Sequence, residues 1–202
     1  MPPSDAEAIA ASHEHPEAFA ELFDRHYDAI AGFLRRRIEP SLGDELAAET
    51  FLQAFDSRIR YDATHADARP WLYGIATNLL RRHRRAEERR LRAYARSAMH
   101  GGELPDLEAV DARLDARAAT GALATALASL GPGERDALLL HAWSDLTYEQ
   151  IAEALEVPVG TVRSRLHRAR GVVRRLLEHC QEDMDEPTVQ AMAAEPVREE
   201  TR

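Results

Sequence analysis

Lysine is absent from this 202-residue sequence, so all 26 basic residues are arginines, and they stand against 35 acidic residues. The single cysteine, Cys180, excludes an intramolecular disulfide framework and a cysteine-rich zinc site, and it suits a reducing compartment. Aromatic residues make up only 6% of the chain, and the ten glycines and ten prolines are close to average in sum. A collagen-like or wholly disordered chain is thereby excluded, and the 45% of hydrophobic residues is enough to build a core.

Long hydrophobic runs are also missing. No stretch approaches the roughly 18 apolar residues of a membrane span, and the first residues (MPPSDAEAIA) have neither the basic nor the apolar part of a signal peptide. We therefore expect no membrane insertion and a cytoplasmic location. The sequence has no glycine-rich phosphate loop, and the pairs His13/His15 and His179/Cys180 lack further ligands at metal spacing. We expect no catalytic residue, no metal and no cofactor.

The net charge of −9 argues at first sight against a nucleic-acid partner. The charge is segregated, however: residues 81–96 hold eight arginines and two glutamates, and residues 163–175 hold six arginines and no acid. Net charge by segment is the informative quantity for partners. Both segments are therefore candidate nucleic-acid surfaces, although an arginine-rich helix face is also commonly no more than solvated surface.

Apolar residues recur at three- and four-residue steps along most of the chain, and no sustained alternation appears, which predicts an all-α fold. One helix is expected over 16–38, ended by Pro40 and Gly43, and a second from Asp44 to Ile59. Residues 60–69 read as a loop, and a third helix begins near Trp71 and continues into the first arginine segment.

The periodicity lapses around residues 97–105, which indicates a linker. We expect two small helical domains joined by a flexible acidic linker, the second containing a helix-turn-helix. The expected boundaries are a flexible N-terminus over 1–17, a first domain over 18–96, the linker over 97–121, a second domain over 122–179 and an acidic flexible tail over 180–202.

The second domain carries the helix-turn-helix pattern. Thr147 and Gln150 fit a capping box at the start of one helix, and Pro158 suits the first turn of the next. On that next helix Val162, Leu166 and Ala169 share one face, and the opposite face carries further side chains, Ser164, His167 and Arg168 among them. Arginines on its flanks can bind phosphates or guanine edges, so this pattern predicts a DNA-reading helix.

Residues 127–177, and VPVGTVRSRLHRAR within them, closely resemble the fourth region of extracytoplasmic-function (group 4) sigma factors of the sigma-70 family. The segments FAELFDRHYDAIAGFLRRRI, GDELAAETFLQAF and ARPWLYGIATNLLRRHRR are similar to successive parts of the family's second region. The resemblance implies a protein that binds core RNA polymerase, directs it to promoters with −35 and −10 elements, and promotes DNA melting.

The resemblance also implies roles for particular residues. Contacts with the −35 element fall on Thr161, Arg163, Ser164, Arg165, His167, Arg168 and Arg170, of which Thr161, Arg165 and Arg170 are expected to contact phosphates. Contacts with the −10 element fall on Arg60, Tyr61, Asp62, Asn78, Arg81, Arg82 and Arg85. Binding to the clamp coiled coil of the largest polymerase subunit falls on Asp44, Glu45, Glu49 and Gln53. The polymerase flap region and promoter DNA are the other expected partners, and such factors are commonly held by an anti-sigma factor.

Two alternatives stay open at this point. A non-sigma helix-turn-helix regulator would need a receiver or ligand domain upstream, and residues 1–100 show no alternation of strands and helices. An enzyme would need a nucleophile or ligand constellation, which the motifs above do not supply.

Overall fold

The computed structural model describes residues 3–98 and 126–185, with side chains described for 3–86, 89 and 126–175. Every regular element within these ranges is helical, which confirms the all-α prediction. None of the described helices is long and apolar enough to cross a bilayer. The elements are α1 (Asp5–Ala11), η1 (Pro16–Phe19), α2 (Ala20–Arg35), α3 (Pro40–Ser57), η2 (Arg58–Arg60), α4 (Arg69–Ala98), α6 (Pro132–Trp143), α7 (Tyr148–Ala154) and α8 (Val159–Asp185).

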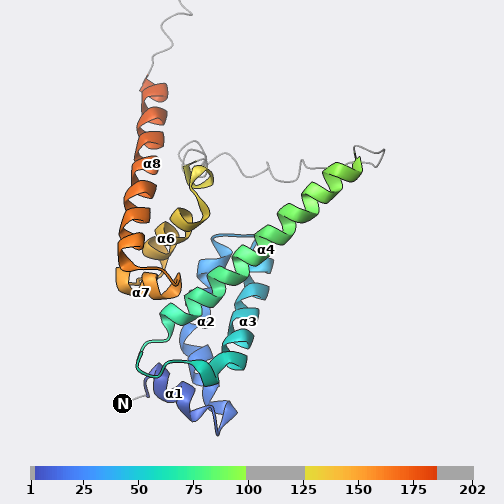
Figure 1. Cartoon of the computed structure of the whole chain (residues 1–202), viewed down its shortest axis with the longest axis vertical. Helices are drawn as coiled ribbons and strands as arrows, with labels where there is room; N and C mark the ends of the chain where they lie inside the picture. The colour runs from blue at the N-terminus through green and yellow to red at the C-terminus, as the bar shows by residue number, and fades with distance from the viewer. Residues whose placement is uncertain (1–2, 99–125, 186–202) are drawn as a thin grey trace, which may run out of the picture.

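Helices α2, α3 and α4 form the first unit (Figure 1). Their apolar stripes meet in one core in which Leu22, Ile30, Leu34 and Leu72 are almost fully buried. The predicted helical stripe over 16–38 is therefore the buried side of η1 and α2. Each of these helices turns an apolar stripe toward the others, and the stripes together form the centre of the core.

Pro40 and Gly43 act differently from the expectation. Pro40 is the first residue of α3, where its missing N–H costs nothing, and the Glu39 carboxylate accepts the amides of Ser41 (3.2 Å) and Leu42 (3.1 Å). Gly43 lies inside α3, where a Cβ would come 2.9 Å from the backbone nitrogen of Arg35. The second helix thus begins four residues before Asp44, and Gly43 lets α3 approach the end of α2 instead of interrupting a helix.

The structure also differs from the flexible N-terminus expected over 1–17, because α1 is ordered by its own capping box. The amide of Glu7 donates to Ser4 Oγ (3.2 Å), and the amide of Ser4 donates to the Glu7 carboxylate (2.7 Å). Ile9 of α1 is 2% exposed and belongs to the core. Likewise α8 continues to Asp185, into the expected tail, while residues 99–125 and 186–202 lie outside the described part.

Helix α1 is fixed to the first unit through Asp5, which is 5% exposed. Its carboxylate lies 2.8 Å from His26 Nε2, accepts the amide of Ala68 (2.9 Å) and pairs with Arg25. Burial alone raises the pKa of Asp5, but these partners outweigh it and lower the pKa to about 2. One carboxylate therefore joins α1, α2 and the loop before α4.

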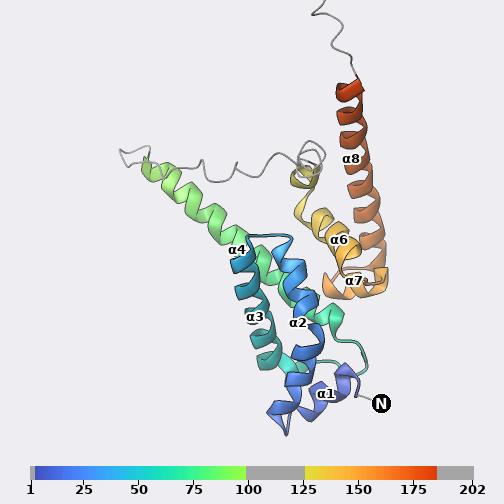
Figure 2. The same ribbon diagram turned by 180° about the vertical axis from the view of Figure 1, so that it is seen from behind.

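The second unit, α6 to α8, packs directly on the first (Figures 1 and 2). Helix α7 crosses α4 so closely that a Cβ on Gly74 would lie 2.8 Å from the carbonyl oxygen of Ala154. Core residues of both units, such as Leu72 and Ile151, belong to one continuous cluster. The two predicted helical units are present, and the interface between them is a feature that the sequence pattern does not indicate.

Asp5→Asn tests the anchor of α1. A carboxyl whose pKa is lower in the folded chain than in the unfolded chain stabilises the fold above its unfolded pKa, and this stabilisation is lost as the pH falls through the folded value. A shift from 3.8 to about 2 corresponds to about 2 kcal/mol. We expect Asp5→Asn to lower the free energy of unfolding by about that amount at pH 7, measured by urea denaturation followed by circular dichroism.

The same measurement at pH 3 should give a difference only about half as large, because the wild-type carboxylate has then lost part of its advantage. Asp24→Asn, at an exposed position of α2, is the control and should leave the midpoint unchanged. An Asp5→Asn deficit that does not shrink between pH 7 and pH 3 would contradict this account.

Candidate nucleic-acid interface

The helix-turn-helix is formed by α7, residues 155–158 and α8. The predicted capping box is confirmed: the amide of Gln150 donates to Thr147 Oγ1 (3.2 Å), and the amide of Thr147 donates to Gln150 Oε1 (2.9 Å). The turn places Glu156 at a φ of 53°, a left-handed conformation that is uncommon for a residue with a side chain. Pro158 directly precedes α8 and accepts the amide of Thr161 (2.8 Å).

The exposed side of α8 is the one that the periodicity predicts. Val162 and Ala169 are fully buried, whereas Ser164, His167 and Arg168 are exposed. Gly160, at the start of the helix, has open space where a Cβ would be, so nothing in the described chain blocks an approach from that side. This end of α8 can therefore lie against a partner surface.

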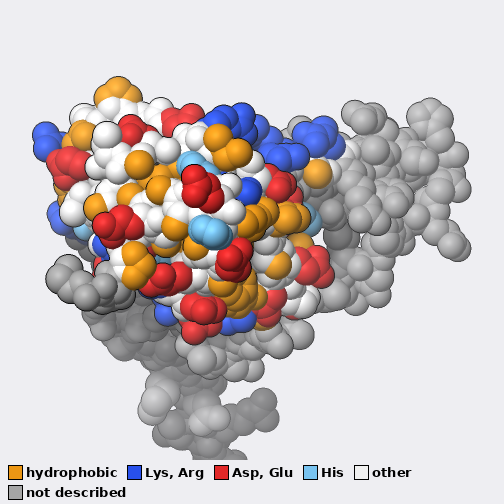
Figure 3. Space-filling view, turned by 90° about the horizontal axis from the view of Figure 1, so that it is seen from below, with side chains coloured by type: hydrophobic (Ala, Val, Ile, Leu, Met, Phe, Trp, Pro, Cys, Tyr) orange, Lys and Arg blue, Asp and Glu red, His pale blue; other side chains and the backbone are white. Residues whose placement is uncertain are grey.

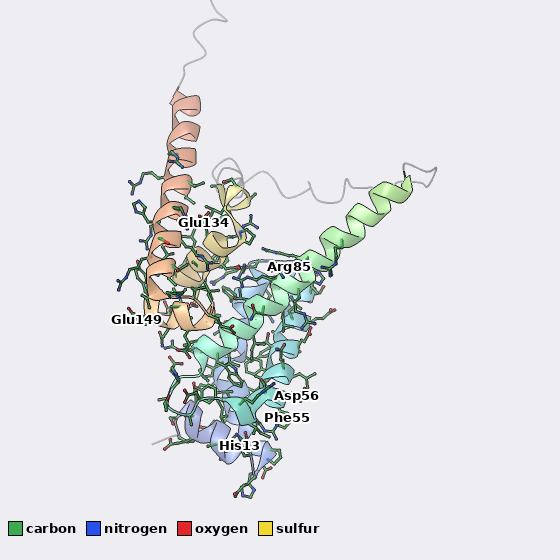
Figure 4. The ribbon with its side chains drawn as sticks, viewed as in Figure 1. His13, Phe55, Asp56, Arg85, Glu134 and Glu149 are labelled. Carbon is green, nitrogen blue, oxygen red and sulfur yellow. The ribbon has the colours of Figure 1, made fainter. Side chains whose placement is uncertain are left out.

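The arginines of α8 have intramolecular partners. Arg168 Nε lies 2.7 Å from the Glu134 carboxylate of α6, and Arg163 lies 3.8 Å from Glu149 of α7; both acids are labelled in Figure 4. Arg170 donates to the hydroxyl of Tyr148 (3.3 Å). Exposed ion pairs of this kind are worth at most about 1 kcal/mol, so the guanidinium groups can exchange these partners for another ligand.

Arg165 differs from the other α8 arginines. It is half-buried, and a Cβ on Gly133 would come 2.9 Å from its guanidinium carbon, so Arg165 lies along the start of α6. Thr161 is half-buried and its carbonyl accepts the hydroxyl of Ser164 (3.0 Å). The side chains of Thr161 and Arg165, both predicted to contact phosphates, are therefore less exposed than those of the other predicted −35 residues.

On α4, Arg82 and Arg85 are exposed and line a groove of about 380 Å³ between α3 and α4. Glu49 of α3 lines the same groove, so this acid faces the arginines of α4. Asn78 is exposed one turn earlier. These positions form the accessible part of the predicted −10 surface, and Arg85 is labelled on it in Figure 4.

Arg81 does not belong to that exposed side. Its Nε lies 2.6 Å from the Asp136 carboxylate of α6, and its side chain is only 26% exposed. The same carboxylate pairs with Arg37 at the end of α2. In this arrangement Arg81 therefore joins the two units of the chain, a role that a helical wheel of α4 alone cannot indicate.

The loop before α4 holds the other predicted −10 residues. Arg60 and Asp62 are exposed, and Asp62 accepts the amide (3.0 Å) and hydroxyl (2.8 Å) of Thr64, which lower its pKa. Tyr61 is half-buried, its ring lies 4.9 Å from that of Trp71, and its hydroxyl donates to the carbonyl of His65 (2.6 Å). Burial first, and the surrounding carboxylates after it, raise the pKa of Tyr61.

Helix α7 reaches this loop as well. His65 Nδ1 lies 3.3 Å from the Glu153 carboxylate, and Gln150 donates to Asp67 (2.8 Å). The predicted −10 loop is thus held by polar side chains of the helix-turn-helix, in the arrangement that the structure shows.

Of the four predicted polymerase-binding residues of α3, Glu45, Glu49 and Gln53 are exposed at four-residue spacing, and Asp44 lies to one side of them. Glu45 and Glu49 are exposed side by side, but Asp44 pairs with Arg35 (2.6 Å), and Gln53 lines a pocket beside Trp71 and Asn78. The centre of the exposed face carries two residues that the sequence reasoning missed, Leu52, which is 62% exposed, and Asp56. Their positions seven and eleven residues after Glu45 are the signal that could have indicated them.

Seen from below, the molecule shows acidic and apolar side chains intermixed, with arginines gathered toward the upper edge of the view (Figure 3). Within the described residues, no group of three or more histidines, cysteines or carboxylates is placed to hold a metal ion.

Comparison with known proteins agrees with this geometry. Residues 22–98 match the family described as Sigma-70 region 2, and residues 120–171 match Sigma-70, region 4. The chain is 32% identical over 165 residues to the RNA polymerase sigma factor CarQ of Myxococcus xanthus, covering 80% of this chain and 90% of CarQ. It is 28% identical over 168 residues to the ECF RNA polymerase sigma-E factor of Haemophilus influenzae, covering 80% and 88%.

Among solved structures, the chain is similar to CnrH in a complex with the cytosolic domain of CnrY. The TM-score is 0.60 at 26% identity, and the alignment covers 87% of this chain and 97% of that one. A match to region 2 is not expected of the alternative, a helix-turn-helix regulator with a receiver or ligand domain. With both regions matched in order and with relatives that span most of its length, the chain belongs to the sigma-70 family as an RNA polymerase sigma factor of the extracytoplasmic-function group.

Proposed function

We propose that α8 reads the −35 element, that α4 and the loop before it engage the −10 element, and that α3 binds core RNA polymerase, in which all catalysis resides. The observation that carries this assignment is the side of α8 formed by Ser164, His167 and Arg168, which is exposed opposite a fully buried stripe. A promoter-specificity subunit needs such a face on one unit and a separate basic surface on the other, and the arginines of α4 supply the second.

Reading of the −35 element requires α8 to enter the major groove with its N-terminal part against base edges. Ser164 and Gly160 are small, which lets the helix backbone approach the bases. Arg168 can donate two hydrogen bonds to guanine O6 and N7, and Arg163 and Arg170 are placed on the flanks to bind phosphates or bases. The exposed ion pair of Arg168 with Glu134 is weak enough for DNA to displace.

Engagement of the −10 element requires a base to leave the stack, which costs a few kcal/mol. Stacking on an aromatic side chain offsets about 1–3 kcal/mol per base, and Tyr61 and Trp71 form an aromatic pair next to the exposed Arg60 and Asp62. Arg82 and Arg85 then supply positive charge for the strand that continues along α4.

Binding to the polymerase is assigned to the exposed face of α3. An exposed leucine surrounded by Glu45, Glu49 and Asp56 combines an apolar anchor with acids on either side of it. That composition suits a helical partner with a hydrophobic stripe flanked by basic residues, which is the chemistry we propose for the clamp coiled coil of the largest subunit.

A protein partner that restrains the factor is a further part of this proposal. The related CnrH was solved in a complex with the cytosolic domain of CnrY, and we propose that this chain is held by an anti-sigma protein. Once released, it would act with the polymerase on chromosomal DNA.

Run-off transcription tests the proposed function as a whole. Core polymerase should give discrete transcripts from a library of promoter-containing fragments only when this chain is added. A complete lack of chain-dependent transcripts, from a preparation that binds core polymerase and unfolds cooperatively, would overturn the assignment.

Arg168→Ala tests the reading face. Loss of a bidentate contact with guanine costs about 1–3 kcal/mol, so we expect transcription from −35-dependent promoters to fall roughly five- to hundredfold while affinity for core polymerase is unchanged. Glu134→Gln is the matched control, because it breaks the same ion pair and leaves the arginine in place. An equal loss in both variants would assign the effect to the α6–α8 contact instead of DNA reading.

Leu52→Ala tests the polymerase-binding face. The side chain is mostly exposed, so the thermal midpoint should hardly change, whereas burial of a leucine against a partner is worth about 1.5–3 kcal/mol. We expect affinity for core polymerase, measured by fluorescence anisotropy, to fall by about tenfold or more. Ile59→Ala is the control, since Ile59 is 71% exposed but lies outside α3; an equal loss there would mean that the face is wrongly placed.

A further inference from the structure

Two arginines of the first unit pair with one carboxylate of the second, and a third arginine lies beside them. Asp136 of α6 pairs with Arg37 and with Arg81, whose Nε lies 2.6 Å away, and Arg84 donates to the carbonyl of Arg37 (2.8 Å). We call Arg37, Arg81 and Arg84 the arginine cluster. The three come from the end of α2 and from two positions, one turn apart, on the side of α4 that faces α6.

Arg37 is the unusual member of the cluster. Its side chain is 1% exposed, and its Nε and Nη1 are buried with no hydrogen-bond partner within the described part of the chain. Burial lowers the pKa of Arg37 and the carboxylate of Asp136 opposes that effect, while the charges of Arg84 and Arg81 add to the lowering. The cluster brings three guanidinium groups together, one of them fully buried, and only one carboxylate pairs with them, so donors are left for an anion with more oxygen atoms than a carboxylate offers.

We propose that the arginine cluster is a phosphate site for the DNA backbone and that Asp136 occupies it intramolecularly until the two units separate. This inference rests on the proposed function, because it takes DNA as the ligand, and it adds a site that includes Arg37 and Arg84. Arg81 is one of the predicted −10 contacts, but Arg37 and Arg84 are not. The cluster would extend the basic surface formed by Arg82 and Arg85 on the exposed side of α4.

The chemistry of the cluster suits a phosphodiester. Guanidinium groups donate paired N–H groups that match phosphate oxygens, and an arginine cluster beside a basic helix is typical of backbone contacts. The cluster is also next to Arg82 and Arg85, which we propose bind the DNA strand along α4. A phosphate bound here would satisfy the donors of Arg37 that Asp136 leaves unpaired.

The same contact keeps the chain closed. While Asp136 fills the cluster, α7 lies on α4 at Gly74 and places Glu153 against the loop that carries Tyr61 and His65. DNA and the second unit therefore compete for one set of side chains, and DNA can take the cluster only from an open chain.

Two variants of the full-length chain open it by different routes. Asp136→Asn removes the charge that compensates buried Arg37, which favours exposure of that guanidinium to water. Gly74→Ala leaves the cluster intact but puts a Cβ where only 2.8 Å is available to the carbonyl oxygen of Ala154. Gly32→Ala is the matched control, since a Cβ there meets nothing within 4 Å.

Opening is measured by the distance between two spin labels, one on Cys180, the sole cysteine, and one on Ala20→Cys, an exposed position of α2. We expect a single narrow distance distribution in the wild-type and Gly32→Ala chains and a shifted, broader distribution in Asp136→Asn and Gly74→Ala. An unchanged distance in both variants would overturn the inference.

DNA binding is measured by anisotropy of a fluorescein-labelled single-stranded oligodeoxynucleotide. We expect Asp136→Asn to bind it about tenfold more tightly than the wild type, with a salt dependence steeper by about 0.7 for each added phosphate contact. Gly74→Ala should change affinity in the same direction. Adding Arg37→Gln to Asp136→Asn should abolish the gain, whereas adding Arg35→Gln, which removes an arginine paired with exposed Asp44, should keep most of it.

Opening without tighter binding, or a gain that survives Arg37→Gln, would overturn the phosphate site. Calorimetry of Asp136→Asn with inorganic phosphate separates the two sources of the oxyanion: binding of phosphate without binding of the oligonucleotide would contradict the assignment to DNA. These assays use the chain without polymerase, so their failure is distinct from a failure of run-off transcription, which would contradict the proposed function itself.

Discussion

Burial of the Arg37 guanidinium is the constraint on which the arrangement of the two units depends. A charge in the protein interior is tolerated only with a partner close by, and the partner is a carboxylate from a helix 99 positions further along the chain. Once Asp136 is in place, α6 lies against α2 and α4, α7 reaches α4 at Gly74, and Gln150 and Glu153 come within reach of the loop before α4.

Both apolar and polar contacts join the two units. Each has its own helices and its own buried apolar residues, and the apolar residues of the two units also meet in one cluster that includes Leu72 and Ile151. The polar contacts across the interface are specific: each joins one residue of α6 or α7 to one residue of the first unit. An interface of this kind sets a geometry and can still open, because water replaces its hydrogen bonds at moderate cost.

Sequence reasoning succeeded where the structure is decided locally. The periods of α2, α4 and α8 and the Thr147–Gln150 capping box follow from neighbouring residues, and the buried and exposed sides of α8 agree with a helical wheel. It failed where distant residues decide. Helix α1 is fixed to the core by the contacts of Asp5 with His26 and Ala68, and Arg81, which the resemblance places among the −10 contacts, pairs with Asp136 of a distant helix.

Asp136 and the arginine cluster belong to the same chain, and this affects how DNA competes for the arginines. A carboxylate is a weak ligand for arginine in water, but a ligand on the same chain is present at an effective concentration of about millimolar. Free DNA in dilute solution must therefore compete with a carboxylate that is present at this much higher effective concentration. DNA that is already bound to the polymerase is also present at a high effective concentration near the cluster. Only in that complex can a DNA phosphate compete with the Asp136 carboxylate for the arginines.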